Sequence, residues 1–156
     1  MTELIRKKLN DSPIARWTAM FIVSFTMMCG YFITDVMASL EVMCTTPVAD
    51  GGLGWSSSEY GFFSGAYGYI NVFLLMLFFG GIILDKCGIR FTGVMSSSLM
   101  LGGALLKWYA LATDFGDATF MGYHLQVVLA SLGFAVFGMG AEITGITVSK
   151  VIIKWF

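Results

Sequence analysis

Two acidic residues stand inside long apolar stretches of this chain. Glu142 lies in an apolar run over about 123–149, and Asp35 lies in a run over about 14–42. An ionised carboxylate at the centre of a membrane costs about 3 kcal/mol or more unless it is paired or faces water, so such residues commonly mark ion, proton or substrate pathways. We expect both acids to line a polar cavity. Alternatively, Glu142 could form a structural pair with another helix, or it could be a protonated acid without a role. Asp35 could instead be solvated by water from outside the membrane.

Tyr67 and Asn71 are polar residues in another apolar run, over 60–84. This run contains no Asp, Glu, Lys or Arg. Because they are four residues apart, they share one face of a helix. They could line the same cavity as the two acids, or they could hydrogen-bond to neighbouring helices, as polar residues in membrane bundles do. Both interpretations stay open, and both residues are candidates for the cavity.

A short charged turn follows this run, and five of its residues form a motif: Gly81, Asp85, Lys86, Gly88 and Arg90. A glycine at position 81 lets a neighbouring helix approach closely, and Gly88 permits a tight turn. Asp85 could pair with a cation or cap a helix across the bundle. Such a contact can be made in one conformation and broken in another. From the residues alone, an ordinary charged turn explains the segment equally well.

Other kinds of chemistry lack the residues they need. The chain has one histidine, and its three cysteines share no CxxC spacing, so we expect no metal site and no cofactor. The few polar residues include no nucleophile–base pair, so we expect no enzyme and no catalytic residue. A net charge of −1 gives no basic surface for nucleic acid.

The composition identifies the solvent of this chain as lipid. Apolar residues make up 57% of its 156 residues and charged residues only 12%, against about 25% charged in soluble domains. A soluble fold of this length still exposes about 30% of the surface of its unfolded chain, so it could not hide so many apolar side chains. Mean hydropathy of +0.80 also excludes disorder. The sequence predicts an integral, multi-pass membrane protein whose first partner is the bilayer.

Four apolar runs, at about 14–42, 60–84, 91–112 and 123–149, are each as long as the ~20 residues that cross a hydrocarbon core. Runs of this length in lipid must be helical, because backbone polar groups can be satisfied there only internally. We therefore predict an all-α membrane protein with four transmembrane helices, in which residues 1–156 form one partial domain.

The basic residues predict the orientation. Eight of the nine fall at one set of span ends: Arg6, Lys7, Lys8, Arg16, Lys86, Arg90, Lys150 and Lys154. By the positive-inside rule, both termini are then cytoplasmic. The ninth, Lys107, is expected to extend its ammonium to the opposite interface. The membrane would be the cell (inner) membrane of a bacterium, or a lysosomal or other membrane of a eukaryote.

The charged turn resembles the signature Gly-x-x-x-Asp-(Arg/Lys)-x-Gly-x-(Arg/Lys) of the major facilitator superfamily, between its second and third helices. Segments 67–72 and 138–142 are similar to a branch of that superfamily that includes a lysosomal dipeptide transporter. The resemblance covers about residues 31–156. It implies a twelve-helix fold, a motif that stabilises one state at the cytoplasmic face, and an acid at Glu142 that faces the central cavity and meets a substrate amino group or a proton.

The chain departs from that pattern at two points. Phe134 stands where superfamily members commonly have an arginine, so any charge relay through that position is in doubt, and four helices are eight fewer than twelve. We expect the N-terminal part of a secondary transporter that works by alternating access. Its substrate would be a small organic solute, and a peptide-like solute is the first candidate. It would be inactive without the missing helices of the same transporter. The alternatives are a complete four-helix protein that pairs with a second copy as a small exporter, and a non-transporting membrane interaction subunit.

Overall fold

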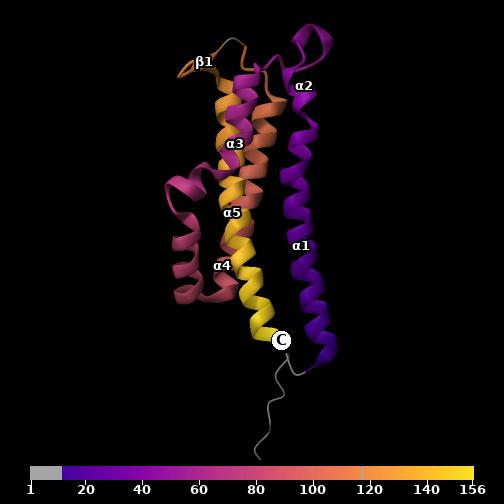
Figure 1. Cartoon of the computed structure of the whole chain (residues 1–156), viewed down its shortest axis with the longest axis vertical. Helices are drawn as coiled ribbons and strands as arrows, with labels where there is room; N and C mark the ends of the chain where they lie inside the picture. The colour runs from indigo at the N-terminus through magenta and orange to yellow at the C-terminus, as the bar shows by residue number, and fades with distance from the viewer. Residues whose placement is uncertain (1–11, 117) are drawn as a thin grey trace, which may run out of the picture.

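The structure is a computed structural model that describes residues 12–116 and 118–156, and helices dominate it (Figure 1). In chain order the elements are α1 Pro13–Ser39, α2 Glu41–Thr45, η2 Val48–Asp50, α3 Ser57–Phe73, α4 Met76–Ala112, β1 Thr119–Phe120, β2 Tyr123–His124 and α5 Leu125–Trp155. The two short strands pair as an antiparallel hairpin. α5 packs mainly against α4 and α3, whereas α1 lies beside them with little contact.

Within residues 12–116 and 118–156, three helices, α1, α4 and α5, are long and apolar enough to cross a membrane. The expected all-α architecture is confirmed, and these helices are compatible with a multi-pass membrane protein. The four spans and the cytoplasmic location of the termini stay predictions.

The run over 60–84, expected as one helix, is interrupted in the structure. α3 ends at Phe73 and α4 begins at Met76, with Leu75 between them in the left-handed region at φ 49°. A non-glycine residue in that region costs about 1–2 kcal/mol. Neither glycine nor proline marks the break, so the local sequence carries no sign of it. Figure 1 shows the chain stepping sideways here before residues 76–87 continue along the bundle.

A second backbone irregularity divides α4. Gly88 has φ 81° and ψ 170°, which are not helical values, so residues 76–87 and 89–112 are separate helical pieces. The charged turn of the motif lies at this point, as the glycine in it suggested. The longer piece then runs back along α5.

Glycines on α4 and α5 bring three helices into backbone contact. A Cβ at Gly103 of α4 would lie 2.4 Å from the backbone nitrogen of Phe137, and a Cβ at Gly138 would lie 2.2 Å from the carbonyl oxygen of Tyr67 on α3. No side chain fits at either position, because the helices would have to separate. Small residues at crossings allow this close packing in membrane bundles. α5 is therefore the central helix of the fold.

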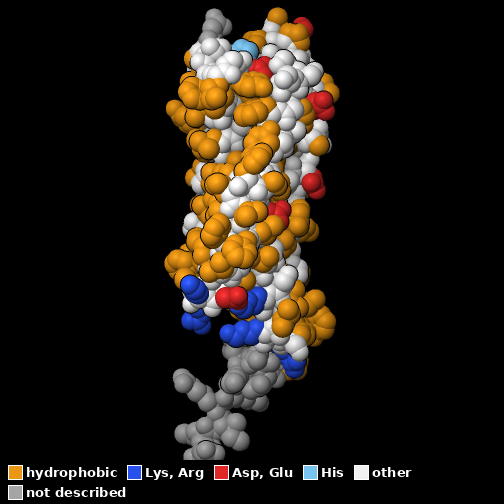
Figure 2. Space-filling model, turned by 60° about the vertical axis from the view of Figure 1, so that its left-hand side comes forward, with side chains coloured by type: hydrophobic (Ala, Val, Ile, Leu, Met, Phe, Trp, Pro, Cys, Tyr) orange, Lys and Arg blue, Asp and Glu red, His pale blue; other side chains and the backbone are white. Residues whose placement is uncertain are grey.

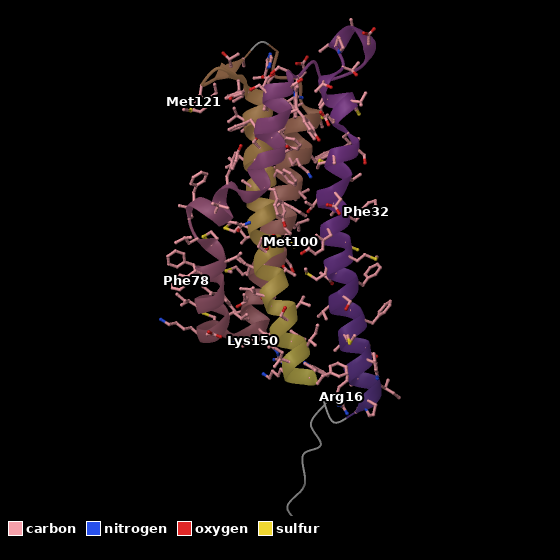
Figure 3. The ribbon with its side chains drawn as sticks, in the orientation of Figure 1. Arg16, Phe32, Phe78, Met100, Met121 and Lys150 are labelled. Atoms are coloured by element: carbon pink, nitrogen blue, oxygen red, sulfur yellow. The ribbon has the colours of Figure 1, made fainter. Side chains whose placement is uncertain are left out.

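The bundle has two chemically different ends. At one, which we call the lysine end, the ring centroids of Trp17 and Phe156 lie 5.7 Å apart, so the start of α1 meets the end of α5. Arg16 and Lys150 lie at this end (Figure 3), and basic side chains gather there in Figure 2. The opposite end, with the β1–β2 hairpin, is the hairpin end. The predicted cations at positions 6, 7 and 8 lie outside the described residues.

Candidate functional site

Glu142 and Tyr67 meet inside the bundle. The Tyr67 hydroxyl on α3 donates a hydrogen bond of 2.9 Å to Oε1 of Glu142 on α5. Gly138, one turn before Glu142, makes this possible, because α3 can rest on α5 there and direct the phenol along the helix toward the carboxylate. Two residues that are 75 positions apart thus form one polar centre in apolar surroundings.

Asn71 lies one turn along α3 from Tyr67 and has no hydrogen bond to Glu142 in the described structure. Its Nδ2 donates a long hydrogen bond of 3.4 Å to the carbonyl oxygen of Tyr67. Its Oδ1 is buried and has no hydrogen-bond partner among the described residues. One interpretation of Asn71 was a hydrogen bond to a neighbouring helix. In the described part of the chain, no neighbouring helix provides a donor to this oxygen. A buried acceptor without a donor is uncommon in folded proteins, so Asn71 keeps one unused binding group.

Asp35 lies apart from these three residues, on the exposed face of α1. It is within electrostatic range of the Tyr67 hydroxyl, but it forms no hydrogen bond or ion pair in the described structure. A small cavity lies where α1, α3, α4 and α5 meet, lined by residues that include Thr34, Tyr67 and Thr144. Its volume of about 10 Å³ holds about one water molecule, so it is closed to an organic solute in this conformation.

The charged turn contacts the end of α5. Lys150 Nζ donates to Asp85 Oδ1 at 2.5 Å, and the two side chains are 41% and 76% exposed. Lys86 and Arg90 are exposed, and neither forms an ion pair in the described structure.

The close helix approach expected at Gly81 occurs at its neighbour instead. A Cβ on Gly80 would lie 2.9 Å from Cγ1 of Ile143, whereas nothing lies within 4 Å of a Cβ on Gly81. The reason is the phase of the helix, because residues 80 and 84 face α5 and residue 81 does not. Sequence spacing could not distinguish adjacent glycines without knowing the partner helix.

Lys107 contradicts the expectation that its side chain reaches the interface. The residue is only 6% exposed, and its Nζ has no hydrogen-bond partner among the described residues. Its ammonium lies 4.8 Å from the ring centroid of Phe134 and 5.6 Å from that of Phe137. Gly133 explains this placement, since a Cβ there would lie 2.6 Å from the backbone nitrogen of Lys107, so the lysine starts from the α4–α5 contact and points inward.

A further polar cluster, at the hairpin end, was not predicted. Glu59 accepts hydrogen bonds from the backbone N–H and hydroxyl of Ser56, each 2.9 Å, and from the backbone N–H of His124 at 3.0 Å. Its Oε1 also lies 2.6 Å from His124 Nδ1. Burial alone would raise the pKa of Glu59, but these hydrogen bonds lower it to about 2. The spacing Ser56-x-x-Glu59 is a capping-box signature that could have revealed half of this cluster.

Comparison with known proteins identified no relative of this chain. No protein-family model, no curated protein and no solved structure matches this chain. The geometry of the described residues and the motif in the charged turn are therefore the grounds for a function.

Proposed function

We propose that this chain takes part in the transmembrane transport of a small organic solute by alternating access, as part of a secondary transporter of the major facilitator type. The observation that carries the proposal is the Tyr67–Glu142 pair, a half-buried carboxylate that is hydrogen-bonded between two apolar helices, next to a cavity that Tyr67 also lines. An acid kept in such a place at an energetic cost is a functional group in membrane proteins by default.

The second support is the position of the charged turn relative to Glu142. Lys150, the partner of Asp85, lies on the same helix as Glu142, eight residues or about 12 Å further along. The exposed ion pair at the lysine end and the internal acid are thus connected through one rigid element. Breaking the Asp85–Lys150 pair releases one contact that holds α5. In an alternating-access mechanism, this contact would be made in one conformation and broken in the conformation that opens the cavity.

Lys107 supplies a buried positive charge that the motif comparison did not anticipate. The resemblance expects a cation at position 134 and finds Phe134, yet the ammonium of Lys107 lies over the ring of that residue. We infer that Lys107 of α4 provides the positive charge that an arginine at position 134 of α5 would otherwise supply.

Uptake measurements test the proposed site. Cells that express the intact reading frame are given labelled dipeptides and single amino acids, with Glu142→Gln as the test variant. Glu41→Gln is the matched control, because Glu41 is an exposed acid outside the polar centre. We expect solute uptake by the native protein and by Glu41→Gln, and its loss in Glu142→Gln at equal abundance. Native uptake in Glu142→Gln would contradict a role for this acid.

The expected partner can be tested separately. Cross-linking and native mass measurement of the 156-residue chain in mild detergent distinguish a second copy from helices supplied by other sequence. A strictly monomeric chain that takes up no solute in liposomes fits the proposed part of a larger transporter. A dimer that transports on its own would instead identify a homodimeric exporter.

A further inference from the structure

The β1–β2 hairpin has a tip of unusual composition. Thr119 pairs with His124 and Phe120 with Tyr123, so the turn consists of Met121 and Gly122. Both have positive φ, 53° and 85°, as a type I′ turn requires. Asparagine or glycine is the favoured residue at the first of these positions, and an unbranched apolar side chain gains nothing there from the backbone. The methionine therefore contributes through what its side chain contacts, not through the turn.

The tip is apolar and unpacked. Met121 is 85% exposed and Phe120 54% exposed, and residues 118–123 include no charged side chain. Figure 3 shows Met121 standing out to the side of the bundle, level with the ends of the helices rather than beyond them. A tip that pointed into water would leave both of these side chains hydrated at a cost.

The base of the hairpin packs on α3 and leads into a candidate membrane span, α5. At its base, Tyr123 stacks on Phe62 of α3 with ring centroids 4.9 Å apart, and β2 leads directly into α5. At the same end of α4, Trp108 and Tyr109 are 67% and 53% exposed. Exposed Trp and Tyr near span ends are typical of the membrane–water interface. The hairpin tip lies at the same end of the bundle as these two aromatic side chains.

We propose that the hairpin is an interfacial anchor, which inserts the Phe120 and Met121 side chains among the phospholipid headgroups beside the bundle. Lipid is the occupant that fits, because the tip is uncharged and apolar and lies beside the spans. The anchor fixes the depth of the hairpin end in the membrane. It depends on α4 and α5 crossing a bilayer and is independent of any solute that the protein transports.

Collisional quenching tests the anchor in the full chain. Cys29 and Cys87 are replaced by serine, and Cys44 stays because it is buried. A fluorophore is then attached through Met121→Cys or, as a control, through Asp50→Cys, at an exposed charged position on η2. The protein is reconstituted in phosphatidylcholine vesicles with either a lipid nitroxide near the headgroup or iodide on both sides of the membrane.

We expect the lipid nitroxide to quench the label at 121 several-fold more than the label at 50, and iodide to show the reverse order. A label at Phe120→Cys should behave like the one at 121. Equal iodide quenching at 121 and 50 would place the tip in water and overturn the proposal. Protection of the label at 121 from both quenchers would show that protein covers the tip, which would also overturn it.

Discussion

Glu59 and Asp85 make polar contacts at opposite ends of the bundle, Glu59 with His124 just before α5 and Asp85 with Lys150 near the end of α5. Glu59 is 8% exposed and accepts hydrogen bonds from Ser56 and His124, through backbone and side chains. Asp85 is 76% exposed and accepts one from Lys150 in the described structure. An exposed ion pair contributes about 0–1 kcal/mol, whereas hydrogen bonds to a charged group contribute about 1.5–3 kcal/mol each. The polar contacts of Glu59 at the hairpin end are therefore stronger than the exposed ion pair at the lysine end.

Removing the buried carboxylate is expected to have the largest effect. Glu59→Ala leaves the backbone N–H groups of Ser56 and His124 without an acceptor in a partly closed site, so we expect a loss of about 2–4 kcal/mol in the free energy of unfolding. Denaturant unfolding in mild detergent measures it. Glu59→Gln is the control, because its amide oxygen retains one acceptor and should recover part of the loss. If Glu59→Ala matched the stability of the native protein, the polar contacts of Glu59 would not be the stronger ones.

Acid should weaken the hairpin end in a defined range. The pKa of Glu59 is lowered from its ordinary value of 4.5 to about 2, so the folded state favours the charged form. The stabilisation is fully present above pH 4.5 and is lost as the pH falls toward 2. We expect the free energy of unfolding to fall over that range in the native protein and to fall less in Glu59→Gln. Parallel curves for the two proteins would remove Glu59 as the titrating group.

Lys107 is a buried charged residue whose ammonium forms no hydrogen bond in the described structure. It is as buried as Glu59 but has no hydrogen-bond partner among the described residues, so its charge lacks the compensation that Glu59 has. Replacing a buried charge by an apolar side chain of similar length is often neutral or stabilising. We expect Lys107→Met to raise the free energy of unfolding by about 0–2 kcal/mol. A clear loss of stability would mean that the two aromatic rings hold the ammonium more strongly than cation–π contacts usually do.

The smallest expected effect is at the lysine end. Asp85→Asn should lower the free energy of unfolding by less than about 1 kcal/mol, and concentrated salt should abolish the difference from the native protein. Lys86→Gln serves as the control, because Lys86 is exposed in the same turn and forms no ion pair in the described structure. If the Asp85→Asn effect equalled that of Glu59→Ala, the two ends would be equivalent and the comparison would fail.

Properties set by composition and charge could be predicted from the sequence. The all-α architecture follows from long apolar runs, and the gathering of basic side chains at one end follows from their positions between those runs. The tight turn at Gly88 was readable from a local motif, because only glycine adopts that backbone easily.

Properties set by helix pairing could not be predicted. The inward direction of Lys107 depends on which glycine of α5 it faces, and the Glu59–His124 contact joins residues 65 positions apart. The break before Leu75 has no helix-breaking residue at all. Each of these depends on how one helix lies against another, and periodicity within one segment does not contain that information.

The two backbone irregularities of the chain have a mechanical consequence together. Residues 76–87 lie between Leu75 and Gly88, both with positive φ, and so form a rod with a joint at each end. The rest of α4 cannot slide along α5, because their backbones interlock at Gly103. Asp85 is carried on the rod and Lys150 on the interlocked pair. A swing of this twelve-residue lever that opens the ion pair therefore also separates Gly80 from Ile143 of α5, while the interlocked pair stays in place.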